Sequence, residues 1–210
     1  MKNIILTLII LFTLSCKAQS PIVNIASDYD SDDIVDGCYL KDVNNSFAPF
    51  IGTWQWTNGT DTLTIVFEKV TMAYSDLSEI YTDELVGKYK YVANGVEIIN
   101  TLNYNINANN VFGVHPTYTQ NGITPILGAR YHNENYGSFH FRDYLKDKSE
   151  KMKFELLDLV TNPPLGNNPP TYSVSQAKLI LQNGEHWNIN GQNPRDPEFT
   201  IPNNITLTKQ

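Results

Sequence analysis

Apolar and polar side chains alternate over short stretches from about residue 50 to the end of the chain. The clearest alternations lie at residues 51–57, 63–68, 88–91, 138–142, 152–156 and 205–208. In each stretch every second side chain is apolar, which is typical of a strand that buries one face. The pattern predicts an all-β fold built from about ten short antiparallel strands.

Asn-Gly dipeptides separate several of these stretches, at residues 58–59, 94–95, 121–122 and 183–184. Asn-Gly favours the positive φ angles that tight two-residue hairpin turns require. The proline-rich stretch 162–170 cannot continue a sheet, so we expect a long loop there. The only competing helix, at residues 75–85, has poor apolar spacing. We therefore expect a meander of neighbouring strands in a single domain that spans residues 49–210.

Strands of this kind must hide their edges by closing into a barrel or by stacking as two sheets. Periodicity alone does not choose between these architectures. We expect an antiparallel up-and-down β-barrel, with a β-sandwich as the alternative.

The first strong strand begins Phe50-Ile51-Gly52-Thr53-Trp54. It resembles the Gly-x-Trp motif of the first strand in lipocalins and fatty-acid-binding proteins. The resemblance implies a lipocalin-like barrel in which Gly52 and Trp54 belong to the closed end. It also implies a cation from a late strand over the indole, for which Lys209 is the candidate. Such a contact contributes about 0.5–1 kcal/mol. In a sandwich, Trp54 would simply be a core aromatic residue.

Residues 1–15 combine Lys2 with an apolar run that only threonines interrupt. The run is shorter than the about 20 residues that a membrane-spanning helix needs, so it predicts a signal peptide. Ser15-Cys16 resembles a bacterial lipobox, which implies cleavage before Cys16, acylation of its thiol and a membrane as partner through the lipid anchor. Ordinary cleavage after Ala18 is the alternative and would give a secreted or periplasmic protein.

The whole chain resembles uncharacterised envelope lipoproteins of the Bacteroidota. The likeness rests on the Ser-Cys-Lys-Ala-Gln segment, the Gly-Thr-Trp strand, the Gly87-Lys-Tyr-Lys-Tyr strand and the terminal Ile-Thr-Leu-Thr-Lys. It implies a location in the cell envelope, with the outer membrane as the expected site, and implies no activity.

Residues 16–48 are acidic and rich in turn-forming residues, which predicts a linker between anchor and domain. Alternating aspartates at residues 28–32 resemble the start of a calcium loop. However, Asp33 stands where such a loop needs glycine, and Tyr39 stands where it needs glutamate. We therefore expect a solvated acidic segment and no metal site.

The net charge is −7 and charged residues make up 18% of the chain. No basic field is present to attract phosphates, so we expect no nucleic acid partner. The four histidines lack the spacing of a zinc site. With Cys16 acylated, Cys38 would be a lone, half-buried thiol. No catalytic or nucleotide-binding motif is present, so we expect no enzyme and no cofactor.

Aromatic residues are the strongest candidates for binding a ligand, because the chain holds 12 tyrosines and 3 tryptophans. Those that could form a stacking surface for a sugar or an amphiphile are Trp56, Tyr89, Tyr91 and Trp187. His140 and Arg142 share one face of a strand and would hold a carboxylate or sulfate if that face is inward; the alternation favours an outward face. We therefore expect a lipoprotein that binds a small amphiphilic or saccharide ligand in its barrel. The alternatives are a surface-interaction or envelope-structural module and, third, a polymer hydrolase.

Overall fold

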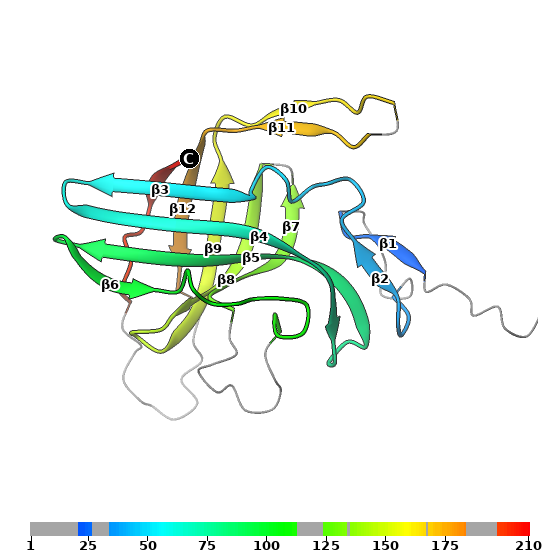
Figure 1. Ribbon diagram of the computed structural model, residues 1–210, viewed down its shortest axis with the longest axis horizontal. Coiled ribbons are helices and arrows are strands. Elements are labelled where there is room, and N and C mark those ends of the chain that lie inside the picture. The colour runs from blue at the N-terminus through cyan, green and yellow to red at the C-terminus, as the bar shows by residue number, and fades with distance from the viewer. Residues whose placement is uncertain (1–20, 27–33, 113–123, 134, 167, 184–196) are drawn as a thin grey trace, which may run out of the picture.

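The computed structural model describes residues 21–26, 34–112, 124–133, 135–166, 168–183 and 197–210 (Figure 1). Within these ranges the regular structure consists of strands, and no helix is present. The strands are β1 (Ile22–Asn24), β2 (Tyr39–Lys41), β3 (Gly52–Asn58), β4 (Asp61–Ser75), β5 (Ile80–Ala93), β6 (Val96–Asn100), β7 (Ile126–Asn133), β8 (Tyr136–Asp143), β9 (Lys148–Leu156), β10 (Val160–Asn162), β11 (Thr171–Ser173), β12 (Gln176–Gln182) and β13 (Ile205–Lys209).

Eight of the described strands form a closed antiparallel barrel, in the order β3, β4, β5, β7, β8, β9, β12 and β13. Strand β13 pairs with β3, and β5 pairs with β7, so the ring of paired strands is continuous. Neighbours in the barrel also follow one another along the chain, apart from the excursions through β6 and through β10 and β11. The prediction of an all-β, up-and-down, lipocalin-like barrel is confirmed, and the β-sandwich is wrong.

Two of the Asn-Gly dipeptides form hairpin turns. Asn58-Gly59 lies between β3 and β4, and Asn94-Gly95 connects β5 to β6. Asn94 and Gly95 have φ angles of 51° and 76°, the positive values that this turn chemistry supplies. The other two dipeptides lie wholly or partly outside the described residues.

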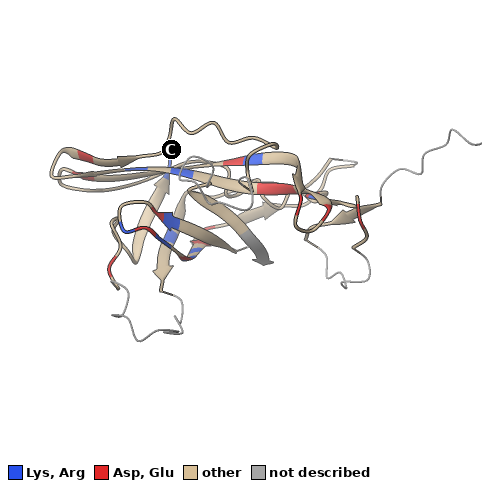
Figure 2. Ribbon diagram, turned by 90° about the horizontal axis from the view of Figure 1, so that it is seen from below, with Lys and Arg blue, Asp and Glu red and all other residues tan. Residues whose placement is uncertain are grey.

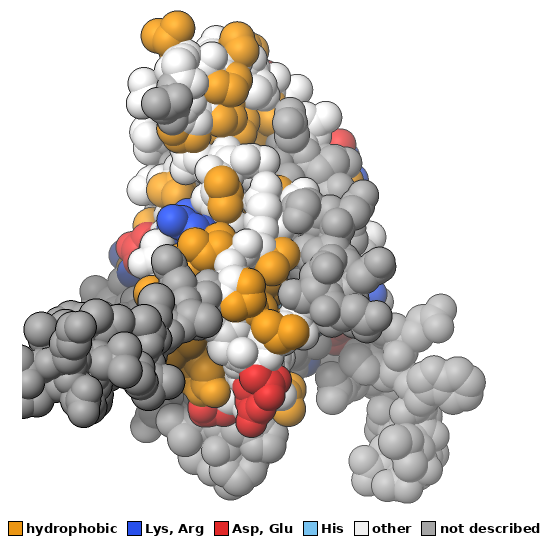
Figure 3. Space-filling model, turned by 90° about the vertical axis from the view of Figure 1, so that its right-hand side faces the viewer, with side chains coloured by type: hydrophobic (Ala, Val, Ile, Leu, Met, Phe, Trp, Pro, Cys, Tyr) orange, Lys and Arg blue, Asp and Glu red, His pale blue; other side chains and the backbone are white. Residues whose placement is uncertain are grey.

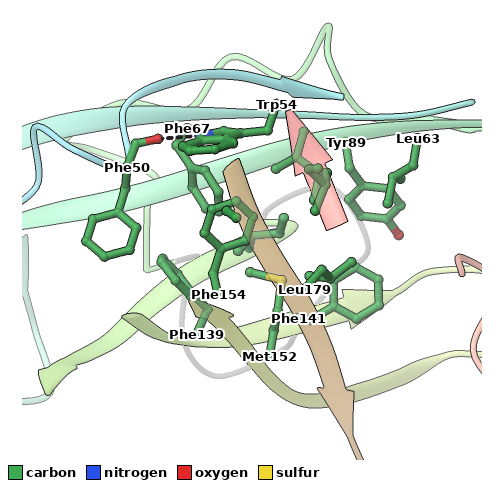
Figure 4. Close-up of a cluster of buried hydrophobic side chains, with 14 of the residues drawn as sticks. Phe50, Trp54, Leu63, Phe67, Tyr89, Phe139, Phe141, Met152, Phe154 and Leu179 are labelled. Carbon is green, nitrogen blue, oxygen red and sulfur yellow. Dashed lines mark hydrogen bonds between the residues drawn. The ribbon is translucent and has the colours of Figure 1, made fainter. Parts of the chain in front are cut away.

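The barrel interior is filled by apolar side chains at its middle level (Figure 4). Alternate residues of each strand point inward, as the sequence pattern predicted, and most of them are completely buried. The rings of Trp54 and Phe67 each lie 5.1 Å from the ring of Phe154, both edge to face. These contacts give the close packing of an ordinary protein core.

Strands β4 and β5 continue beyond the barrel as a long ribbon (Figure 1). A bulge between Val70 and Ala73, with Met72 at a φ of 58°, marks the point where their pairing shifts. Beyond it β2 pairs with β5 in parallel, and β1 pairs with β2 in parallel. We call this four-stranded region, formed by β1, β2 and the tip of the β4–β5 ribbon, the extension.

The extension includes part of residues 16–48, which we expected to be a linker. Residues 34–48 pack against the rest of the molecule, and Cys38 is fully buried rather than half-buried. Cys38 and Leu40 form a small apolar cluster with Ile80 of β5. Strand β2 is short and lies among acidic residues, so it contains too few apolar positions for an alternation to be recognised in the sequence.

The proline-rich stretch links β10 to β11, which form a separate two-stranded hairpin between β9 and β12. This hairpin projects from the barrel (Figure 1). Its prolines lie in the connecting loop, where no ladder hydrogen bond is lost.

Candidate functional site

Strands β3, β4 and β5 carry inward-facing residues in successive levels along the barrel. Trp54 pairs with Ile65, and Ile65 pairs with Tyr89; all are fully buried. One level further, Trp56 pairs with Leu63, and Leu63 pairs with Tyr91. Trp56 and Tyr91 are only half-buried, although they pack against the core. The barrel therefore has a covered end beyond Trp54 and a less covered end at Trp56 and Tyr91.

At the covered end, the single polar group of the Trp54 side chain has a hydrogen-bond partner. The Trp54 Nε1–H donates to the Phe50 carbonyl at 2.7 Å (Figure 4). Lys209 Nζ lies 5.2 Å from the centroid of the Trp54 ring and donates to the Pro49 carbonyl at 2.9 Å. Burial lowers the pKa of Lys209. Glycine is favoured at position 52 for two reasons: a Cβ there would lie 3.2 Å from Lys209 Cε, and the φ of 122° is one that other residues rarely adopt.

The chain before β3 covers this end. Phe47 and Phe50 are buried in the main core, and the ring of Phe50 lies 6.3 Å from that of Phe139 and 6.4 Å from that of Phe154. The segment 46–51 therefore seals the barrel with apolar side chains.

A buried ionic cluster holds the sealing segment to the β4–β5 ribbon. Lys69 Nζ lies 3.0 Å from a carboxylate oxygen of Asp42 and 3.1 Å from one of Asp83. Tyr39 Oη–H, the Met72 amide and the Asp42 amide all donate to Asp83. Burial alone would raise the pKa of Asp83, but these hydrogen bonds and Lys69 outweigh it and lower the pKa. Because each carboxylate is satisfied, the cluster is suited to a structural role.

At the other end, tyrosines replace the apolar seal. Tyr89 Oη–H donates to the Arg142 carbonyl at 2.9 Å. The rings of Tyr104 and Tyr144 meet edge to face at 5.9 Å, and Tyr104 is 41% exposed. Burial, followed by nearby Tyr104, raises the pKa of Tyr144. This end offers aromatic faces and a phenol group to solvent.

One side of the tyrosine end is covered by residues 197–201, which we call the strap. Asp143 accepts hydrogen bonds from the Thr200 amide and the Thr200 hydroxyl, both at 2.7 Å. Lys148 Nζ donates to the Glu198 carbonyl at 2.6 Å and lies 4.0 Å from the centroid of the Phe199 ring. Asp143 and Lys148 therefore fix the strap over β8 and β9.

The structure separates the residues that the sequence singled out. Tyr89 belongs to the core and offers no ring face to a ligand. His140 is exposed, and Arg142 donates to Ser149 and Asp147. The alternate residues Phe139 and Phe141 are buried, so the face of His140 and Arg142 is outward. Trp56 and Tyr91 remain together at the less covered end, whereas Trp187 and Cys16 lie outside the described residues.

Sequence reasoning missed the buried charges inside the barrel, Asp143, Lys148 and Glu150. A usable signal existed, because the alternation of Met152 and Phe154 continues back to Glu150 and Lys148. Their charge argued against an inward position. Tyr144 and Tyr104 lie outside the strands, so the alternation could not place them at this end of the barrel.

Glu84 is a separate titratable group, on the outer face of β5 beside Val86. Val86 belongs to a small apolar cluster with Val70 and Val111. Burial raises the pKa of Glu84 to about 7, with a hydrogen bond from Thr82 acting in the opposite direction. Glu84 is thus a carboxyl group that titrates near neutral pH.

Neither a metal site nor a membrane-spanning helix is found among the described residues. They contain no group of three or more His, Cys, Asp and Glu side chains that could hold a metal ion. They also contain no helix with the length and apolar character needed to cross a bilayer.

The fold and the two ends define the class: a lipocalin-like barrel with a solid middle, one sealed end and one aromatic end. The model of a protein family described as a family of unknown function (DUF6705) matches residues 1–210. The chain belongs to this family. No curated protein and no solved structure matches the chain.

Proposed function

We propose that the protein is a non-enzymatic lipoprotein of the cell envelope that binds a small amphiphilic or saccharide ligand at the aromatic end of its barrel. One observation carries the proposal. Along β3 and β5, inward-facing aromatic residues change from fully buried, at Trp54 and Tyr89, to half-buried, at Trp56 and Tyr91. Half-exposed rings held by a rigid sheet are a ready stacking surface.

The filled core limits how such a ligand binds. Side chains pack the barrel at the level of Trp54 and Phe154, so the ligand reaches only the level of Trp56 and Tyr91. A sugar ring or a short acyl chain would lie against these two residues. The exposed Tyr104 would supply a hydroxyl group at the same end.

The proposal is tested by titrating the full chain with three probes: maltose, laurate and dodecyl maltoside below its micelle concentration. Calorimetry is expected to detect binding of at least one probe. Trp56→Ala and Tyr91→Ala are expected to weaken that binding about tenfold or more, since each removes a stacking partner. Tyr74→Ala, on the extension, is the matched control. Binding that survives both barrel variants, or no binding of any probe, would overturn the proposal.

The lipid anchor is a separate part of the proposal. The motif around Cys16 supports it. Mass spectrometry of the protein recovered from cells is expected to show an acylated Cys16 and a membrane fraction, both lost in Cys16→Ala. A mature chain that begins after Ala18 and leaves with the soluble fraction would favour ordinary export instead.

A second candidate function, a surface-interaction module, is favoured by the extension. The extension places a sheet face outside the barrel, and closure of the barrel does not require this face.

A further inference from the structure

Three tyrosines and an isoleucine form a straight row across the four strands of the extension. Tyr74 on β4 pairs with Tyr81 on β5, Tyr81 pairs with Tyr39 on β2, and Tyr39 pairs with Ile22 on β1. Directly paired residues project on the same side of a sheet, so the row lies on one face. The rings of Tyr74 and Tyr81 are 5.0 Å apart.

The opposite face of the extension is already covered. Cys38, Leu40 and Ile80 are buried there, and Ile25 and Ile34 pack over them. On the tyrosine face the two ends of the row are open among the described residues, with Tyr74 43% exposed and Ile22 50% exposed, while Tyr39 and Tyr81 between them are half-buried. Figure 3 shows hydrophobic side chains exposed on this side of the molecule. An aromatic sheet face of this kind is typical of an interaction surface.

Carboxylates border the row at the turn between β4 and β5. The Gly37 amide donates to the Glu79 carbonyl at 2.6 Å, which ties the segment containing Asp36 to the turn. Asp76 and Glu79 belong to the short connection between Ser75 and Ile80. Burial raises the pKa of Tyr74, and Glu79, Asp76, Tyr81 and Asp36 raise it further. Figures 2 and 3 show acidic residues gathered at this end of the molecule.

These carboxylates have no cation of their own among the described residues. The ion pairs there leave out Asp36, Asp76 and Glu79, in contrast to Asp42 and Asp83, which share Lys69. Lys41 follows Tyr39 by two residues along β2, so it lies on the tyrosine face, but a single lysine leaves the surface net negative. The surface therefore attracts positive charge.

We propose that this tyrosine face is a docking surface for a basic polypeptide segment rich in arginine or lysine. Guanidinium and ammonium groups stack on tyrosine rings and pair with carboxylates, so both features of the surface select the same partner. With strands about 4.8 Å apart, the row is about 14 Å long. This length fits about four residues of an extended chain.

The test uses fluorescein-labelled octa-arginine as the probe and the full chain, with anisotropy measured at about 50 and 150 mM salt. Octa-arginine is expected to bind, and octa-glutamate is not. Tyr74→Ala is expected to weaken binding about two- to fivefold, whereas Tyr74→Phe keeps it, because the ring face supplies the attraction. The double variant Asp76→Asn with Glu79→Gln is expected to weaken it about fivefold and to reduce its salt dependence.

Two controls separate this surface from general attraction to a negative protein. Glu68→Gln removes a carboxylate from the outer face of the barrel, and Tyr104→Ala removes an exposed ring from its aromatic end. Both are expected to bind octa-arginine as the unmodified chain does. Absence of binding, or an unchanged affinity in Tyr74→Ala, would overturn the proposal, as would equal losses in Glu68→Gln and the double variant. Because the ligand proposal depends on Trp56 and Tyr91, the two can fail independently.

Discussion

The two ends of the barrel use the same residue types for different purposes. Trp54 and Trp56 are two residues apart on β3 and both point inward, yet Trp54 is fully buried and Trp56 is half-buried. What differs is the chain that crosses each end. Residues 46–51 cover Trp54 with Phe47 and Phe50, whereas the strap, the segment described at the other end, is held to Asp143 of β8 and Lys148 of β9. The role of an aromatic residue in this barrel is therefore set by its cover rather than by its strand.

The largest effect should come from truncating the two tryptophans in parallel. Trp54→Ala removes a fully packed indole and is expected to lower the free energy of unfolding by about 3–5 kcal/mol. Trp56→Ala should cost less than half as much, because part of its indole is exposed in the folded state. Urea denaturation measures both values, and equal losses would mean that the two ends are equally covered.

The ionic cluster of the sealed end provides the next test. Asp83→Ala removes the acceptor for three hydrogen bonds and one of the two partners of Lys69, so it is expected to cost about 3 kcal/mol at neutral pH. The pKa of Asp83 is lower in the folded state, so its contribution is present above about pH 4 and is lost in acid. The difference in unfolding free energy between Asp83→Ala and the unmodified chain should therefore become smaller below pH 4. A variant as stable as the unmodified chain would show that the cluster does not hold the seal.

Glu84 should give a smaller effect of the opposite sign. Its pKa is about 7 in the folded protein and 4.5 otherwise, so folding favours its protonated form. Stability is then highest below pH 4.5, falls as the pH rises to 7, and is level above that. Glu84→Gln is expected to stabilise the protein by about 1–2 kcal/mol at pH 8, with little change at pH 4. Glu68→Gln is the control, because Glu68 is an exposed partner of Lys88.

The smallest effect is expected at the aromatic end. Tyr104 is 41% exposed and its ring contacts only the ring of Tyr144 among the described aromatic residues. Tyr104→Ala should therefore change the free energy of unfolding by less than about 0.5 kcal/mol. A larger loss in thermal or urea unfolding would mean that Tyr104 belongs to the core and that this end is sealed as well.

Most strands of the barrel could be predicted from the local alternation of apolar and polar residues in the sequence. Leu63, Ile65 and Phe67 are inward because the side-chain period of a strand is two, a property that depends on no other part of the chain. The Gly-x-Trp motif and Lys209 were placed at one end by the resemblance to lipocalins, because periodicity alone does not bring the first and last strands of the barrel together.

The parts that escaped prediction depend on contacts between distant segments. The parallel pairing of Tyr39 with Tyr81 requires β5 to extend beyond the barrel, and no local pattern in the sequence predicts that extension. The hydrogen bonds from Thr200 to Asp143 join residues 57 apart in the sequence, and the strap has no periodicity of its own. The buried Lys148 likewise depends on distant partners, because Glu198 and Phe199 belong to that same strap.

The ring of strands has two narrow seams of two residue pairs each, one between β13 and β3 and one between β5 and β7. Strands β4 and β5 pair over nearly their whole length, but β5 meets β7 only through Val86 with Leu127 and Gly87 with Ile126. A Cβ at Gly87 would lie 2.9 Å from Ile126 Cβ, so glycine is what allows the two edges to meet. Opening the seam between β5 and β7 breaks fewer hydrogen bonds than opening any long ladder, so the amides of β7 beside it should exchange with deuterium sooner than those of β4. Transient access to the core would then occur through the wall of the molecule rather than through either end.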